Sequence, residues 1–62
     1  MKKRTIEELR RIHGYTQKQT ADALGITERG YAYKISGERS WKAEELVKLA
    51  ELFNVSSKSI RI

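Results

Sequence analysis

Apolar residues recur along this chain at intervals of three and four, in short runs separated by glycine, asparagine, serine and threonine. Such spacing places the apolar side chains on one face of a helix. The first run is opened by Thr5, which has capping-box spacing to Glu8, and is closed by Gly14, a residue type favoured just after a helix. His13 lies in its last turn. These signals predict a first helix over 6–13 whose apolar stripe is Ile6, Leu9 and Ile12.

Two further helices are predicted on either side of Gly25. Thr16 and Gln19 again fit a capping box, so the second helix begins after Thr16. Gly25 ends it, because glycine adopts a positive φ without the strain that a side chain would add. Thr27 is a natural N-cap for a third helix, which ends at Gly37.

The fourth helix has the strongest periodicity of the chain. Asn54 is a suitable residue after its end, and Ser56 caps a short last turn that returns Ile60 to the core. Strand signals are weak throughout. The pattern therefore predicts an all-α fold, a compact bundle of about five short helices that forms a single domain over 1–62. The apolar face of the fourth helix consists of Ala43, Leu46, Val47, Leu49, Ala50 and Phe53.

The composition excludes several classes of function. The 62 residues include no cysteine and a single histidine, so a disulfide, a thiolate site and a multi-histidine metal site are excluded. The chain has no phosphate-cradling glycine loop and no nucleophile–base arrangement, so we expect no enzyme, no cofactor and no small-molecule ligand. The acidic residues Glu7, Glu8, Glu44 and Glu45 are interpreted as solvated helix faces.

The charge balance favours a polyanionic partner. Thirteen Lys and Arg against eight Asp and Glu give a net charge of +5 and a pI near 9.8. In a domain this small, such a positive field suits nucleic acid, although a basic protein that is merely soluble has the same composition. No stretch is apolar and long enough to span a bilayer, and charged residues follow the basic N-terminus where a signal peptide would be apolar. We therefore expect a cytoplasmic protein without a membrane partner.

The segment around Gly25 has the residues that a tight turn between two helices requires. Ala21 is small where the helices would cross, and Leu24 and Ile26 flank the turn and fix its angle. This segment resembles the helix-turn-helix of the Cro/repressor family, and the likeness extends over nearly the whole chain in one register. The resemblance implies a third helix that enters the major groove of double-stranded DNA. The other matching segments are Ile6 with Leu9-Arg10, Gly14-Tyr15-Thr16-Gln17, Gly37 and the run from Leu46 to Ser56.

The resemblance implies a role for each matching position, and side-chain chemistry agrees with it. Arg29 suits guanine O6 and N7 and Glu28 suits cytosine N4, or else Arg29 is solvated or ion-paired and Glu28 complements the helix dipole. Tyr33 would contact a thymine methyl or a phosphate. The expected base contacts are therefore Glu28, Arg29 and Tyr33. The expected phosphate contacts are Gln17, Lys18, Thr27, Lys34, Arg39, Ser40 and Lys42, with Lys2, Lys3 and Arg4 as a mobile basic arm that either touches DNA or is only solvated.

Three positions depart from the family pattern. Relatives usually have Ile or Val at Tyr31 and an apolar or aromatic residue at Lys34. At Ile35 they have an acid that often pairs with the arginine matching Arg10. We therefore predict a shifted packing in which Tyr31 and Ile35 fill the core, Lys34 is more exposed, and Arg10 lacks that partner. Trp41 stands where relatives often have a proline, and is a weak indication of a dimer contact.

The leading hypothesis is a transcription regulator: a Cro-like repressor that binds a palindromic operator as a homodimer, either preformed or paired only on DNA. One recognition helix covers a few base pairs, so specificity would need two half-sites about one helical turn apart. The resemblance places the dimer contact near Trp41 and over 55–62. The alternative is an antitoxin or another protein-interaction module on the same fold. RNA binding fits less well, because a helix of this kind suits the major groove of duplex DNA.

Overall fold

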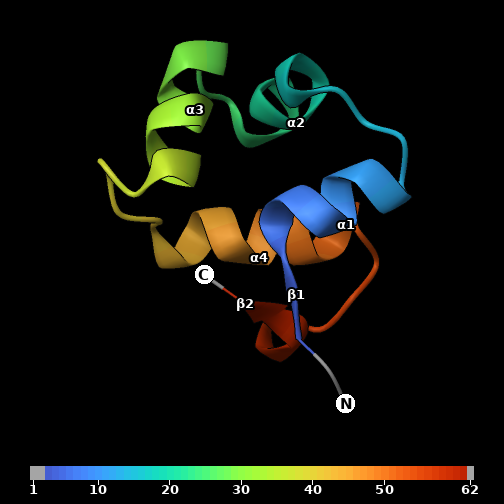
Figure 1. The fold of residues 1–62 in the computed structure, drawn as a ribbon. Helices are drawn as coiled ribbons and strands as arrows, with labels where there is room; N and C mark the ends of the chain where they lie inside the picture. Colours follow the sequence, from blue (N-terminus) through green and yellow to red (C-terminus); the bar gives the residue numbers. More distant parts are fainter. Residues whose placement is uncertain (1–2, 62) are drawn as a thin grey trace.

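Within residues 3–61, which the computed structural model describes, four α-helices surround one small core and two short strands pair beside them (Figure 1). The strands β1 (Arg4–Thr5) and β2 (Ile60–Arg61) run parallel, with Arg4 opposite Ile60. The helices are α1 (Ile6–Ile12), α2 (Gln17–Leu24), α3 (Glu28–Ser36) and α4 (Ala43–Leu52), followed by the 3-10 turn η1 (Ser57–Ser59).

The prediction of an all-α fold with five helices is confirmed for four helices and is wrong near the two ends of the chain. The expected fifth helix is the 3-10 turn η1, because only three residues separate its N-cap, Ser56, from the start of β2 at Ile60. Two-residue strands are too short to show an alternating pattern in the sequence. Arg4 belongs to β1 and not to a mobile arm, and Lys2 lies outside the described residues.

The predicted helix starts and the tight turn are confirmed. Thr5 and Thr16 each form a complete capping box, and the Thr27 hydroxyl accepts a 3.0 Å hydrogen bond from the backbone N–H of Gly30. Gly25 has a φ of +74°, a left-handed conformation that strains residues with a side chain. The bend between α2 and α3 is therefore set by local backbone chemistry.

The core combines side chains from all four helices and β2. Its largest fully buried members are Tyr31 and Phe53, so the expected burial of Tyr31 is confirmed, whereas Ile35 is only half-buried and packs against the edge of the core. In Figure 1, α4 runs below α2 and α3, with the strands on its other side. The buried apolar residues are Ile6, Leu9, Ala21, Leu24, Tyr31, Leu49, Ala50, Phe53 and Ile60.

Ile12 was expected to continue the apolar stripe of α1, but its side chain is 58% exposed. With 3.6 residues per turn, the residue four positions after Leu9 points more nearly in the direction of Leu9, toward the core, than the residue three positions after it. The former residue is His13, whose ring centroid lies 5.5 Å from that of Phe53. The ring of His13, which is itself exposed, therefore lies against the core at Phe53, where Ile12 was expected to pack.

Two residues that were predicted on the apolar face of α4 are not buried: Ala43 is exposed, and so is Val47, with 52% of its surface exposed. Val47 lies two positions before Leu49, which is fully buried, and so points to nearly the opposite side of α4. The inward position one turn before Leu49 is occupied by Glu45, which is only 6% exposed. Glu45 was interpreted as solvated, so this interpretation is wrong as well.

Candidate nucleic-acid interface

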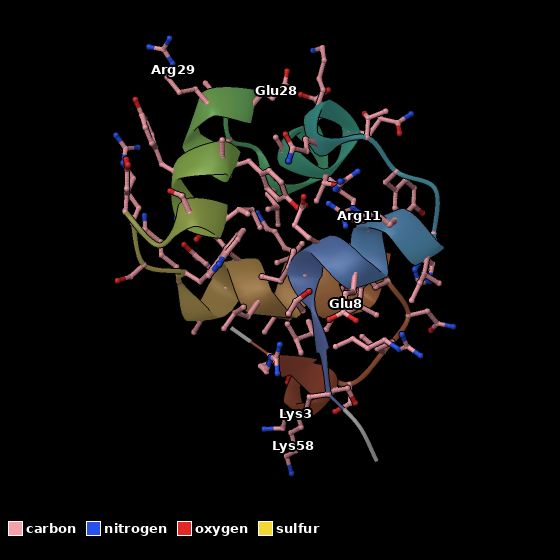
Figure 2. All side chains as sticks on the ribbon, in the orientation of Figure 1. Lys3, Glu8, Arg11, Glu28, Arg29 and Lys58 are labelled. Carbon is pink, nitrogen blue, oxygen red and sulfur yellow. The ribbon has the colours of Figure 1, made fainter. Side chains whose placement is uncertain are left out.

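The turn at Gly25 presents the first turn of α3 at the end of the molecule farthest from α4 (Figure 2). Ala21 is fully buried, as the close approach of α2 and α3 requires. Glu28 and Arg29 are both exposed, and Arg29 points away from the body of the protein (Figure 2). Within residues 3–61, neither side chain takes part in a hydrogen bond or an ion pair with another residue. Both are therefore available to an external partner.

Tyr33, the third expected base contact, lies one turn after Arg29 and is half-buried. The guanidinium carbon of Arg39, from the loop after α3, lies 5.0 Å from the centroid of its ring. This contact is a cation–π interaction between an expected base contact and an expected phosphate contact. The structure thus joins α3 to the loop that follows it along one basic, aromatic edge.

The remaining expected phosphate contacts lie on α2, on the turn and in the same loop. Lys18, Ser40 and Lys42 are exposed, and the ammonium of Lys18 is 3.8 Å from the carboxylate of Asp22 in a solvated pair that binds weakly. Thr27 uses its oxygen as an acceptor for the α3 cap, which leaves its hydroxyl hydrogen to donate.

Lys34 is not exposed, contrary to the prediction: its side chain is 9% exposed and that of Glu45 is 8% exposed. The Lys34 ammonium is 2.6 Å from Glu45 Oε1 and donates to the carbonyl oxygen of Ser40 at 3.2 Å. Burial by itself raises the pKa of the Glu45 carboxyl, but hydrogen bonds from Lys34 and from the backbone of Lys42 outweigh it and hold that pKa below its ordinary value. This buried ion pair fixes the loop after α3 onto α4.

Trp41 is half-buried and packs on its own chain. Its ring meets that of Tyr31 edge-on at a centroid distance of 6.0 Å, and the ammonium of Lys34 lies 5.6 Å from its centroid. These internal contacts account for the position of Trp41, so it gives no separate indication of a dimer contact.

Glu7 is the centre of a polar cluster that joins three helices, and its interpretation as a solvated residue is wrong. Its carboxylate accepts a 2.7 Å hydrogen bond from Nε of Arg10 and another of 2.7 Å from the hydroxyl of Tyr31. Its second oxygen accepts from Nε2 of Gln17 at 3.1 Å. Arg10, which lacks an acid at Ile35, therefore has its acid partner within its own helix.

The hydrogen bond from Arg10 is the largest influence on Glu7 and, with those from Tyr31 and Gln17, lowers the pKa of its carboxyl from 4.5 to about 2 against the opposing effect of burial. Burial, together with the bond to Glu7, raises the pKa of the Tyr31 hydroxyl well above its ordinary value. At neutral pH the cluster is therefore a carboxylate held by a guanidinium and a neutral phenol.

Because the pKa of Glu7 is lower in the folded than in the unfolded protein, its contribution to stability is complete above about pH 4.5 and is lost as the pH falls toward 2. We expect Glu7→Gln to be less stable than the unmodified protein at pH 6, and the difference to shrink between pH 4.5 and pH 2. Urea unfolding at a series of pH values measures this difference. Glu44→Gln, at an exposed position of α4, is the matched control and should show no such trend. A difference for Glu7→Gln that stays constant down to pH 2 would contradict the assignment.

Two signals in the sequence pointed to this cluster. Glu7 and Arg10 have the i,i+3 spacing of a helical ion pair, and a tyrosine placed in the core must find a partner for its hydroxyl. Neither signal shows that Gln17 joins the same carboxylate, because that contact depends on how α1 and α2 pack.

No helix in the described part of the chain is long and apolar enough to cross a membrane. The same residues contain no group of three His, Asp or Glu side chains that would hold a metal ion.

The comparisons with known proteins identify a family. A family model described as helix-turn-helix matches residues 6–60, which runs from α1 to the first residue of β2. No curated protein and no solved structure matches the chain closely enough to be a relative. The helix-turn-helix match includes the capped α3, the tight turn and the exposed Arg29, which fits a regulatory, DNA-binding family. This protein therefore belongs to the Cro/repressor type of the helix-turn-helix family.

Proposed function

We propose that this protein is a sequence-specific transcription repressor that binds a palindromic operator in duplex DNA as a homodimer. The observation that carries the proposal is the first turn of α3, which is capped by Thr27 and presents Glu28 and Arg29 without internal partners among residues 3–61. A helix end of this kind is what a helix-turn-helix protein inserts into the major groove.

In this proposal Arg29 reads a guanine through O6 and N7, and Glu28 accepts from N4 of a cytosine. Tyr33 reaches a thymine methyl or a phosphate one turn further along α3. The Arg39 guanidinium already packs on the Tyr33 ring, so the position of Tyr33 should change little on binding.

Phosphate contacts on either side of α3 would set the register of the protein on DNA. Gln17 and Lys18 supply them from the start of α2, and Thr27 from the turn. Lys34 is left out of this set, because its ammonium is engaged by Glu45; its contribution is to hold the loop. The contacts from that loop are Arg39, Ser40 and Lys42.

Dimerisation is proposed because one α3 covers too few base pairs for specificity. The exposed Val47 and the half-buried Val55 line a shallow groove between α4 and η1, next to the segment 55–62, where the family resemblance implies a dimer contact. The basic net charge adds affinity for any duplex through counterion release.

Selection of binding sites from a random pool of duplex DNA at near-physiological salt tests the proposal. We expect an enriched inverted repeat whose half-sites are about ten base pairs apart. An enriched single half-site would overturn the dimer. Binding that falls steeply with salt but enriches no sequence would overturn the base contacts.

A further inference from the structure

The cluster around Glu7 connects the core of the protein to the start of α2. Tyr31 reaches it from α3, Arg10 from α1 and Gln17 from α2, so one carboxylate is shared by three helices. The side chain of Glu7 is 19% exposed, and both of its oxygens are engaged. It is therefore a rigid acceptor and not a mobile surface charge.

Gln17 is the member of this cluster that lies at the start of α2. It is the first residue of α2, it is half-buried, and one N–H of its amide group donates to Glu7 Oε1. An amide nitrogen has two N–H groups, so the second remains for an external acceptor. Its backbone N–H lies in the first turn of α2, where helices leave N–H groups without internal partners.

A free glutamine side chain samples many rotamers, and ordering it during binding reduces affinity. The hydrogen bond to Glu7 orders Gln17 before DNA arrives. Glu7 is itself ordered by Arg10 Nε at 2.7 Å and by the Tyr31 hydroxyl at 2.7 Å. The chain of contacts thus runs from the core to a proposed phosphate contact.

We propose that Glu7 is a positioning residue for DNA binding: it strengthens the contact between Gln17 and a backbone phosphate although its own charge repels DNA. This inference rests on the proposed function. Simple electrostatics predicts the opposite change in affinity, because removing an acidic residue from a DNA-binding protein strengthens its attraction to phosphates.

The test measures the affinity of Glu7→Ala, Gln17→Ala and the double variant for duplex DNA. We expect Glu7→Ala to bind about three- to tenfold more weakly, the range that follows from ordering one side chain, even though its net charge rises by one. In the Gln17→Ala background the same change should no longer weaken binding. Tighter binding by Glu7→Ala, or losses from the two changes that simply multiply, would overturn the proposal.

Tyr31→Phe separates positioning from stability. It removes the hydrogen bond to Glu7 on the core side, but Arg10 still donates to both carboxylate oxygens of Glu7 and so keeps Glu7 in place for Gln17. We expect a lower unfolding midpoint and an affinity within about twofold of the unmodified protein. A loss of affinity equal to that of Glu7→Ala would show that general destabilisation is the cause, and would overturn the proposal.

Glu7→Asp serves if Glu7→Ala does not fold. It keeps the charge but withdraws the carboxylate by one methylene from Gln17, so we expect weaker binding that again disappears in the Gln17→Ala background. Unchanged affinity in folded Glu7→Asp would overturn the proposal.

All variants are measured on the selected operator and on a scrambled duplex, because phosphate contacts do not depend on sequence. If the unmodified protein bound the operator and the scrambled duplex equally well, the proposed function would be wrong. The weakening by Glu7→Ala that depends on Gln17 can still be measured on either duplex.

Discussion

Replacing Glu45 with alanine is expected to lower the free energy of unfolding by about 3–5 kcal/mol, because the Lys34 ammonium then stays buried without a counter-charge. The pair has a 2.6 Å contact, and both side chains are over nine-tenths buried. The backbone N–H of Lys42, which donates to Glu45 at 2.9 Å, loses its acceptor as well. A core this small supplies only about 3–5 kcal/mol in total, so much of the variant should be unfolded at 37 °C. Urea and thermal unfolding followed by circular dichroism measure the loss.

Two further variants show whether the buried charge is the cause. Glu44→Ala removes a neighbouring exposed carboxylate from the same turn of α4 and should change stability by about 0.5 kcal/mol or less. Lys34→Met combined with Glu45→Ala removes the stranded ammonium and should recover about 2 kcal/mol relative to Glu45→Ala alone. If the double variant is no more stable than Glu45→Ala, the unpaired ammonium is not the reason for the loss.

Arg29→Ala is expected to weaken binding to the selected operator by about 10- to 100-fold and to relax the preference at one position in each half-site. This range corresponds to the discrimination supplied by one bidentate contact to guanine. Arg29 is exposed and has no internal partner among residues 3–61, so the fold should keep its stability. Fluorescence anisotropy with the operator and with single-base variants measures both effects.

Lys58→Ala is the matched control for this change. Lys58 is also a single exposed cation, but it lies at the end of the molecule opposite Arg29, as does Lys3 (Figure 2). We expect it to weaken binding far less and to leave the sequence preference unchanged. Equal losses from both variants would show that Arg29 contributes only its charge, and the assignment of a base contact would then be wrong.

The features that could be predicted from the sequence are the ones that depend on local chemistry. Thr5, Thr16 and Thr27 act on N–H groups three residues away, and the conformation of Gly25 is a property of one residue. The order of helices, the tight turn and the exposed start of α3 follow from these interactions.

The features that could not be predicted depend on which helices meet. Glu45 has the sequence context of a solvated residue, and Glu7 that of a local ion pair with Arg10. Only the packing of α1 on α3 and of α3 on α4 brings Tyr31 to Glu7 and Lys34 to Glu45. Lys34 was expected to be exposed because it stands where relatives usually have an apolar or aromatic residue. In the structure, the buried Glu45 of α4 pairs with it and accommodates its charge. The ten expected DNA contacts stay predictions, and Lys34 is the one whose surroundings argue against it.

The pairing of Arg4 with Ile60 has a consequence for how the protein folds. Contacts among neighbouring helices are local in the chain and form quickly, whereas this strand pair closes a loop that contains nearly every other residue. We therefore expect the strand pair to form last during folding and to open first in the native state. Since the strands lie across α4 from the start of α3 (Figure 1), opening of this pair would leave the proposed DNA-contacting end intact.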